Sequence, residues 1–207
     1  MKVLLVNGSP HENGCTDAAL SFVASALREE GIETEKFWIG TGATGGCIAC
    51  GGCRTTGACI RSERVQTFAE LADEADGFVF GSPVHYAGIS GSMDAFMDCL
   101  FFSSPPTRFR LKPAACVLSA RRAGTTAAYD QMIKYFGISE MPIVSSTYWN
   151  MVHGAKAEDV LEDAEGVACM RTLGRNMAYL LRAIEAGKKT GVIPPEPQPV
   201  PRTNFIR

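Results

Sequence analysis

Long apolar runs and an excess of charge of one sign are both missing from this sequence. The 20 lysine and arginine residues nearly balance the 22 aspartate and glutamate residues, so the formal net charge is −2. Nucleic-acid-binding domains usually carry a clustered basic surface, which this composition does not provide. No stretch approaches the roughly 18 apolar residues of a membrane span, and the apolar N-terminal run ends at Asn7-Gly8, too early for an export signal. We therefore expect a cytoplasmic protein with no nucleic-acid partner and no membrane partner.

Cysteine is abundant, with eight residues in a chain of 207, and half of them are crowded into one short segment. Secreted disulfide scaffolds are usually shorter, so this crowding favours a metal or cluster site over disulfides. The crowded residues are Cys47, Cys50, Cys53 and Cys59. Three cysteines that fall on predicted strands or helices are expected to be inert core thiols, namely Cys99, Cys116 and Cys169.

The spacing of the four crowded cysteines narrows the choice of metal. Cysteines at three-residue steps can ligate one iron–sulfur cubane, as in bacterial ferredoxins, where the fourth cysteine follows after three residues. Here it follows after five, and the longer return loop would let Cys59 reach the same cluster. Zinc usually takes two CxxC pairs separated by a longer insert. A [4Fe–4S] cluster is therefore our first interpretation, with zinc, redox-active disulfides and free thiols as alternatives.

Short apolar runs alternate with segments of helical periodicity along most of the chain. Strands are predicted at 3–6, 33–39, 78–80, 114–119 and 143–144. Helices are predicted at 16–30, 93–102, 126–136 and 158–186, with one more that Ser62 caps. This order is typical of an α/β fold with a doubly wound, five-stranded parallel sheet and helices on both faces. We expect one domain over 1–190 with a cysteine-rich loop at 40–60, and an extended, proline-rich tail over 191–207.

The first predicted strand leads into a glycine- and serine-rich loop that is followed by a helix. Ser9 and Thr16 offer hydroxyl donors there, and the start of a helix attracts an anion. A Walker loop is excluded because the two loop glycines stand one residue too far apart and Cys15 replaces the lysine, and this loop contains no dinucleotide-type GxGxxG. The loop is therefore typical of a flavodoxin-type monophosphate site, although a plain strand-to-helix turn would have a similar composition.

A second segment, 81–88, follows the third predicted strand, and its Tyr86 could form an aromatic wall for a flat ring. Together, Gly8-Ser9-Pro10 with Gly14 and Thr16, and Gly81-Ser82-Pro83-Val84-His85-Tyr86, resemble the NADPH-dependent FMN reductase superfamily. With the cysteine cluster, the sequence is most similar to the iron–sulfur flavoprotein branch of that superfamily. The resemblance runs from Met1 to about Gly154 and implies a flavodoxin-like fold and an FMN-dependent oxidoreductase, linked to NAD(P)H and carrying a [4Fe–4S] cluster.

The resemblance also implies a set of cofactor-binding residues. Those that would hold the FMN phosphate are Ser9, His11, Asn13, Gly14, Cys15 and Thr16, with His11 where many relatives have arginine or lysine. Those that would border the ring system are Ser82, Pro83, Val84, His85 and Tyr86 on one side and Ala120, Arg121 and Gly124 on the other. Under this interpretation the catalytic chemistry belongs to the cofactor, and the protein supplies position and electrostatics.

Two other functions fit the same residues. The first is a cluster-free NAD(P)H-dependent reductase of FMN, quinones or nitro compounds, and the second is a non-enzymatic electron carrier or redox sensor. In each case we expect a small-molecule or protein electron donor and acceptor. We also expect a homodimer or homotetramer, because Tyr148-Trp149-Asn150 and the proline-rich tail are predicted to lie at the surface.

Overall fold

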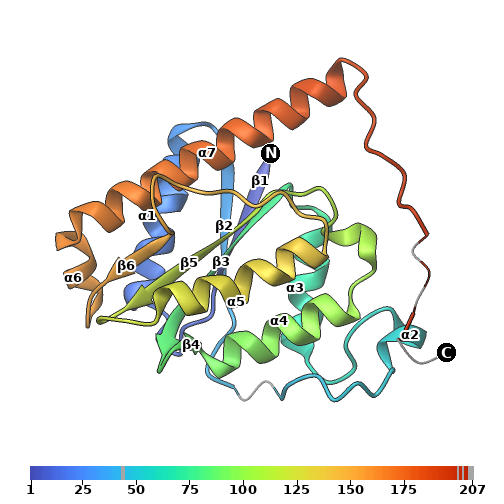
Figure 1. Cartoon of the computed structure of the whole chain (residues 1–207), viewed down its shortest axis with the longest axis horizontal. Coiled ribbons are helices and arrows are strands. Elements are labelled where there is room, and N and C mark those ends of the chain that lie inside the picture. The colour runs from blue at the N-terminus through green and yellow to red at the C-terminus, as the bar shows by residue number, and fades with distance from the viewer. Residues whose placement is uncertain (43–44, 200, 202, 205–207) are drawn as a thin grey trace.

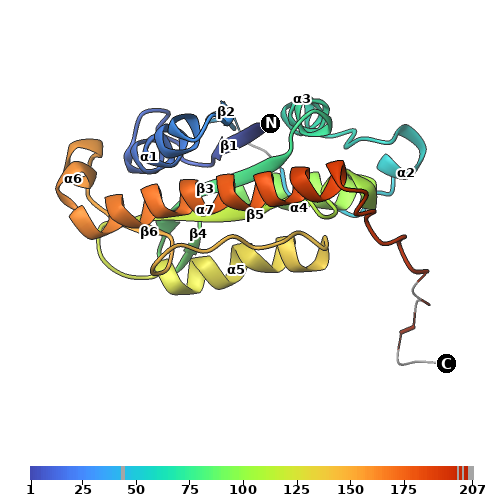
Figure 2. The ribbon, with the colours of Figure 1, turned by 90° about the horizontal axis from the view of Figure 1, so that it is seen from above.

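A sheet of six strands forms the centre of the molecule, and helices cover both of its faces (Figure 1 and Figure 2). The computed structural model describes residues 1–42, 45–199, 201 and 203–204. The strands are β1 (Lys2–Asn7), β2 (Glu33–Trp38), β3 (Gly77–His85), β4 (Gly88–Ile89), β5 (Ala114–Ala120) and β6 (Met151–His153). Five of them run parallel in the order β2-β1-β3-β5-β6, and β4 pairs antiparallel with the end of β3. This is the strand order of a flavodoxin-like doubly wound sheet, so the predicted fold class is confirmed.

The helices divide between the two faces of the sheet. They are α1 (Cys15–Glu29), α2 (Cys53–Thr56), α3 (Glu63–Asp73), α4 (Gly91–Ser103), α5 (Thr125–Ile138), α6 (Ala157–Glu162) and α7 (Ala164–Lys189). A further 3₁₀ turn spans Pro106–Arg108. Buried side chains of α1, α6 and α7 pack on one face, and those of α3, α4 and α5 pack on the other. The predicted cap of α3 is confirmed, since Ser62 Oγ accepts the Val65 N–H at 3.3 Å.

Strand β1 shows why this sequence forms a sheet that is buried on both sides. Val3 and Leu5 belong to the core under α1 and α7, whereas Leu4 and Val6 belong to the core under α3, α4 and α5. Successive side chains of a strand point to opposite faces, so a central strand of a doubly wound sheet reads as a continuous apolar run.

The fifth parallel strand was predicted at the wrong place. The sequence favoured 143–144, but Ile143 makes only an isolated bridge to Ala114, while β6 pairs with the end of β5. The 142–144 segment bonds to Ala114 alone, at the start of β5, whereas β6 pairs with 118–120 at the end of β5, a register that the sequence alone does not reveal.

The long C-terminal helix was also predicted as one piece, but it is broken at Asp163. This residue adopts φ −76° and ψ 75°, which ends α6 and starts α7. Its carboxylate accepts the Gly166 N–H at 2.9 Å and the His153 N–H at 2.7 Å. Aspartate favours such capping positions because its side chain competes for backbone N–H groups.

The chain leaves α7 at Lys189 and runs away from the helix as an extended segment (Figure 1). Residues 192–199 form no helix or strand, and Arg110 Nη1 donates to the Pro195 carbonyl oxygen at 2.8 Å. A cavity of about 840 Å³ lies beneath this tail at the amino edge of the sheet. The division into a domain and a tail stays a prediction. None of the helices in the described ranges combines the length and apolarity needed to cross a membrane.

Candidate functional site

Loops that follow β1, β3 and β5 meet at the carboxyl edge of the sheet. Asn7 of β1 stands opposite Gly81 of β3, and Ala120 of β5 stands opposite His153 of β6. The Gly8 N–H donates to the Gly81 carbonyl oxygen at 2.8 Å, which ties the first loop to the neighbouring strand. The predicted binding segments therefore gather at the edge where ligands of doubly wound sheets bind.

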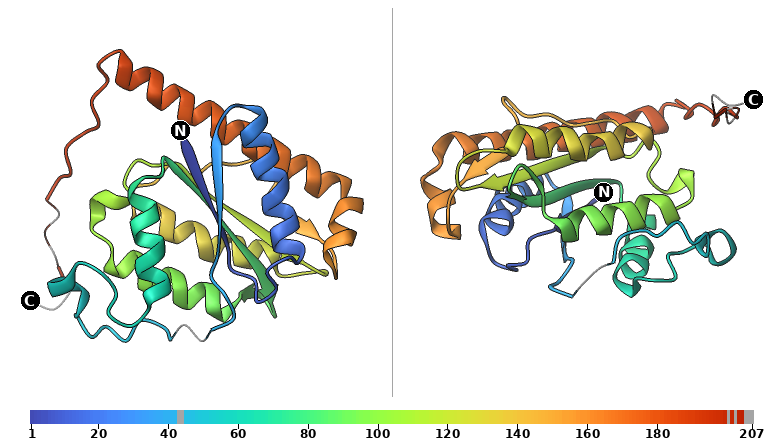
Figure 3. Two further views of the ribbon diagram at one scale, coloured as in Figure 1. Left: turned by 180° about the vertical axis from the view of Figure 1, so that it is seen from behind. Right: turned by 60° about the horizontal axis from the view of Figure 1, so that its bottom comes forward.

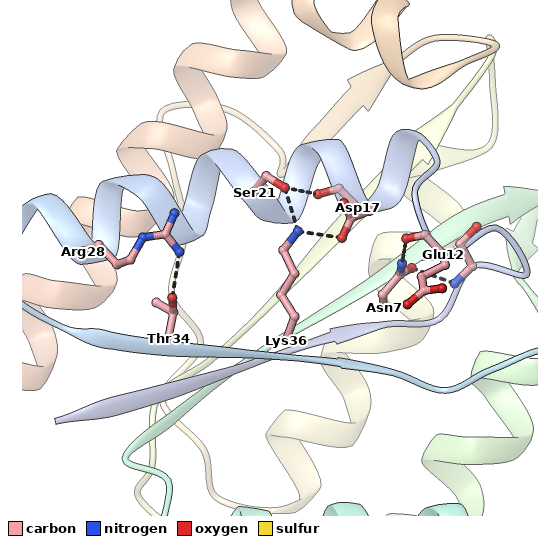
Figure 4. Close-up of polar contacts among 8 residues, drawn as sticks. Asn7, Glu12, Asp17, Ser21, Arg28, Thr34 and Lys36 are labelled. Carbon is pink, nitrogen blue, oxygen red and sulfur yellow. Dashed lines mark hydrogen bonds and ion pairs between the residues drawn. The ribbon is translucent and has the colours of Figure 1, made fainter.

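The loop between β1 and α1 is held in shape by its own hydrogen bonds. The Asn7 side chain donates to the Glu12 carbonyl oxygen at 2.8 Å and accepts the Ser9 N–H at 3.0 Å (Figure 4). Ser9 Oγ accepts the His11 N–H at 3.1 Å, and Trp38 Nε1 donates to the Ser9 carbonyl oxygen at 2.8 Å. Neither Asn7 nor Trp38 was predicted from the sequence to belong to the site. The one available signal was the position of Asn7 directly after an apolar run.

The N-terminus of α1 follows this loop without a side-chain cap. Gly14 is its N-cap residue, so the N–H groups of the first turn are left for a ligand and, with the helix dipole, suit an anion. Asp17 in this turn would repel an anion, but Lys36 of β2 reaches across, with an Nζ–Oδ1 distance of 2.6 Å (Figure 4). Lys36 also donates to Ser21 Oγ at 2.7 Å. Lys36 was missed because its partner lies on another element.

The side chains predicted to hold a phosphate differ in exposure. Ser9 and Thr16 are buried, and a hydrogen bond of 2.8 Å joins Thr16 Oγ1 to Ser119 Oγ. Cys15 Sγ donates to the Gly154 carbonyl oxygen at 3.5 Å, and burial raises the pKa of this thiol. The predicted residues left at the surface are His11 and Asn13. The Thr16 hydroxyl therefore has a protein partner, and its contact with a phosphate stays a prediction.

The second predicted segment forms a tight hairpin between β3 and β4. β3 continues to His85, the chain turns at Tyr86 with φ 59°, and Val84 pairs with Ile89. The Tyr86 side chain is fully exposed at the tip of this hairpin, and His85 is exposed beside it. The Tyr86 side chain is therefore open to solvent, and its stacking on a flat ring stays a prediction.

Ser82 and Ser90 join this hairpin to the first loop. Ser82 is fully buried, and its Oγ accepts the Ser90 N–H at 3.0 Å and donates to the Pro83 carbonyl oxygen at 2.9 Å. Ser90 Oγ caps α4 by accepting the Met93 N–H at 3.2 Å and donates to the Gly8 carbonyl oxygen at 2.8 Å. The Ser82 side chain thus fixes the relative position of the two loops rather than pointing into open space.

The third loop closes against the hairpin at Gly124. This residue has φ 97°, and a Cβ there would lie 2.8 Å from Val84 Cγ1 and 3.0 Å from the Tyr86 carbonyl oxygen. Only glycine combines this backbone conformation with so close an approach. Ala120 is buried at the end of β5, and Arg121 is exposed in the loop itself.

The cysteine-rich loop lies at a different place, beyond the end of the layer formed by α3 and α4 (Figure 3). Its four crowded cysteines line one small cavity of about 20 Å³ together with Cys99 of α4. The rest of the lining is mainly apolar and includes Ile48, Ile60 and Phe102. Among the described residues, no three cysteine, histidine or acidic side chains stand close enough to share one metal ion. The thiols thus border one common space.

Cys99 was predicted to be an inert core thiol, but its position is more specific than that. It is 1% exposed, its Sγ donates to the Gly45 carbonyl oxygen at 3.6 Å, and burial together with the neighbouring Cys59 raises its pKa to about 12. Cys116 and Cys169 are buried in the two cores, as expected. Sequence spacing could not reveal Cys99 because it lies 40 residues beyond Cys59.

Comparison with known proteins agrees with this geometry. Residues 1–156 match the profile of the family described as NADPH-dependent FMN reductase. The chain belongs to this family. An iron-sulfur flavoprotein of Methanocaldococcus jannaschii is 30% identical over 196 residues, which cover 89% of this chain and all of the relative. An iron-sulfur flavoprotein of Archaeoglobus fulgidus is 30% identical over 168 residues, which cover 79% of this chain and 76% of the relative.

Solved structures confirm the flavodoxin-like fold of this member of the FMN reductase family. RosB superimposes with a TM-score of 0.69 at 14% identity, covering 100% of this chain and 92% of RosB. An archaeal flavodoxin superimposes with a TM-score of 0.57 at 17% identity, covering 88% of this chain and 99% of the flavodoxin. At these identities the likeness concerns the fold alone.

In this FMN reductase family member, the three predicted cofactor segments lie at one edge of the sheet, and the cysteine loop lies apart from them. Helix α4 spans the two, because its N-cap Ser90 bonds to Gly8 and its residue Cys99 lines the cysteine cavity. The two regions are separated along α4 by about nine residues, or about 14 Å at 1.5 Å per residue.

Proposed function

We propose that the chain binds FMN at the carboxyl edge of its sheet and works as an FMN-dependent oxidoreductase. The observation that carries this proposal is the uncapped N-terminus of α1, next to a hairpin and a loop that approach each other at Gly124. A phosphate suits the first feature because backbone N–H groups and the helix dipole favour an anion. A flat ring suits the hairpin and the loop that meet at Gly124, because the exposed Tyr86 lies at the tip of this hairpin.

Different residues would contact the phosphate and the ring of FMN. Ser9 and the first-turn N–H groups of α1 would hold the phosphate, and Thr16 would join them by turning its hydroxyl from Ser119. Segments 83–86 and 120–124 would border the ring on its two sides. When bound, FMN supplies hydride and single-electron transfer, so the chain needs no catalytic acid or base of its own.

We further propose that Cys47, Cys50, Cys53 and Cys59 hold a [4Fe–4S] cluster. The donor set fits, because all four thiols border one cavity whose other walls are mainly apolar. Cys47 and Cys50 are exposed, so their part of the loop can adjust around a cluster, whereas Cys59 packs against the core under α3, α4 and α5. The two relatives described above, both iron-sulfur flavoproteins, support the same assignment. A bound cluster would supply one-electron transfer.

The cluster is tested by iron content after purification without oxygen. Cys50→Ala should lose the iron and the broad absorbance beyond the flavin bands, because one iron is left without its thiolate. FMN should remain bound, since its proposed contacts lie elsewhere. Cys116→Ala is the matched control, because it removes a buried thiol from β5 and should spare both groups. Wild-type protein that lacks iron after production in cells able to assemble clusters would contradict the cluster and leave a plain flavin reductase.

The electron donor is proposed to be NAD(P)H, as the family description suggests. Arg121 and Arg122 are exposed beside the proposed ring site, where a pyridine nucleotide would present its phosphates. Oxidation of NADPH or NADH by the FMN-loaded protein is the test, and no turnover with either nucleotide would favour an electron carrier or redox sensor.

The proposed setting is a homodimer or homotetramer in a reducing compartment such as the cytoplasm. All eight cysteines are free thiols, which suits such a compartment. Tyr148 and Trp149 are 54% and 47% exposed, and aromatic side chains of this kind are common at subunit interfaces. Asn150, which was also predicted to lie at the surface, is instead buried.

A further inference from the structure

An aromatic groove of about 380 Å³ lies between the C-terminal ends of α4 and α5, away from the proposed FMN site. Aromatic rings pack side by side in its lining, with Phe101 centred 4.8 Å from Phe109 and 5.5 Å from Tyr135. Two further lining residues, Phe102 and Ile138, are 53% and 86% exposed. Exposed apolar side chains gathered at a groove indicate a surface that binds a partner.

The polar part of this groove is acidic. Asp98 in the lining and Asp94 one turn before it both lie within hydrogen-bond distance of the Tyr135 hydroxyl, at 2.5 Å and 3.2 Å. In the described part of the chain no lysine or arginine lines the groove, although Arg110 beside it pairs with Glu140 of the lining at 2.7 Å. The groove therefore favours a partner segment that is apolar and ends in a basic residue.

The proline-rich tail of this chain has that composition. Five of the eight residues 194–201 are prolines, and Arg202 follows them, outside the described residues. Such a sequence favours the polyproline II conformation, and segments of this kind dock in aromatic-lined grooves because they lose little conformational entropy on binding. Residues 191–199 are all exposed, and the tail runs clear of the helices in two views (Figure 1 and Figure 2). The chain's own tail therefore does not fill the groove.

The tail leaves its own chain beside the groove. Arg110 connects the two, because it pairs with Glu140 and its Nη1 donates to the Pro195 carbonyl oxygen at 2.8 Å. In a two-fold symmetric dimer with its axis at this edge, each tail would pass directly to the groove of the other chain. The six residues 196–201 would extend about 19 Å beyond the Arg110 contact, at 3.1 Å per residue.

We propose that the groove between α4 and α5 binds the proline-rich tail of a second copy of this chain, so that two copies exchange their tails. This inference rests on the homo-oligomer proposed above and names the segments that hold it together. The aromatic rings of the groove would pack on the prolines, and its acidic part would attract Arg202. Because Phe102 lines both the groove and the cysteine cavity, the incoming tail would lie next to the cysteine loop of the other chain.

The test measures the dissociation constant of the oligomer by light scattering over a dilution series, with full-length chains. The tail variant carries Pro197→Ser, Pro199→Ser and Pro201→Ser, and the groove variant carries Ile138→Lys. Each should raise the dissociation constant at least about tenfold, as expected when a central contact of an interface is lost. Leu161→Lys is the matched control, because Leu161 is also an exposed helical residue but lies outside the groove, and it should leave the dissociation constant unchanged.

Mixing the two variants separates exchange between chains from docking within one chain. A mixed dimer has one intact tail facing one intact groove, whereas a dimer of either variant alone has no such pair. The mixture should therefore associate more tightly than either variant.

The remaining outcomes each overturn a stated claim. Unchanged dissociation constants in both variants, or weaker association without recovery on mixing, would refute the exchanged tails. A wild-type chain that stays monomeric would overturn the proposed oligomer together with this inference. The proposed FMN site is judged separately, since neither the tail nor Ile138 lies at the carboxyl edge of the sheet.

Discussion

The packing between the first loop and α4 predicts that Gly8→Ala will damage both folding and FMN binding. A Cβ at Gly8 would lie 2.6 Å from Met93 Sδ and 2.8 Å from Met93 Cβ. Met93 is fully buried, and its Cβ is part of α4 itself, so rotation of the side chain cannot relieve the overlap. The loop or the helix must shift, and overpacking of this kind costs roughly 1–3 kcal/mol.

The shift should weaken cofactor binding because Gly8 precedes the N–H groups proposed to hold the phosphate. Loss of about 1.4 kcal/mol is a tenfold loss of affinity, and we expect at least that for Gly8→Ala. The measurements are urea unfolding of the apoprotein and a titration with FMN. Gly91→Ala is the matched control, because a methyl group added at this position, at the start of the same helix, would meet no atom within 4 Å. It should be neutral or stabilising by up to about 1 kcal/mol.

A double substitution separates this overlap from a general loss of stability. Met93→Ala alone should cost about 2–5 kcal/mol, as for other buried methionines. In the double variant the overlaps with Met93 Sδ and Cγ are gone and only the one with Cβ stays, so the double variant should lose about 0.5–3 kcal/mol less stability than the sum of the two single variants. A Gly8→Ala protein as stable as wild type and with normal FMN affinity would refute the packing argument.

Two further predictions concern the same edge of the sheet, and a third concerns the assembly. Ser9→Ala combined with Thr16→Val should weaken FMN binding tenfold or more, because each charge-assisted hydrogen bond contributes about 1.5–3 kcal/mol, and unchanged affinity would place the phosphate elsewhere. Lys36→Met should weaken FMN binding about two- to fivefold, the 0.3–1 kcal/mol of a charge near a helix end, because it exposes the Asp17 carboxylate. Adding Asp17→Asn to the Lys36→Met protein should restore the affinity for FMN. Arg28→Met is the control, because it removes the Arg28–Thr34 contact between α1 and β2 (Figure 4) and should leave the affinity unchanged. Light scattering should show a dimer or tetramer, and a monomer with full FMN occupancy would contradict the proposed assembly.

The parts of the fold that the sequence predicts correctly depend on local patterns. The apolar run of β1 and the helical spacing of Leu20, Val23 and Leu27 in α1 both reflect burial, and all three of these α1 side chains are fully buried. Loops at the ends of parallel strands gather at one edge, so the topology follows once the strands are known.

The parts that the sequence misses depend on contacts between distant residues. β6 is defined by its register with β5, and the break at Asp163 depends on its bonds to Gly166 and His153. From the sequence, Lys36 is an ordinary strand residue, and only the packing of α1 on β2 shows that it pairs with Asp17. From the sequence, Cys99 is a core residue of a helix, and only the structure shows that it lines a cavity together with the loop cysteines.

The central claim is that the first loop and α1 bind the phosphate of FMN. The most direct measurement is a comparison of FMN and riboflavin binding to the apoprotein, because riboflavin has the same ring system but no phosphate. If the loop holds the phosphate through several charge-assisted hydrogen bonds, FMN should bind at least about 100-fold more tightly, equivalent to about 2.7 kcal/mol. Equal affinities for the two flavins, or no binding of either, would contradict this account.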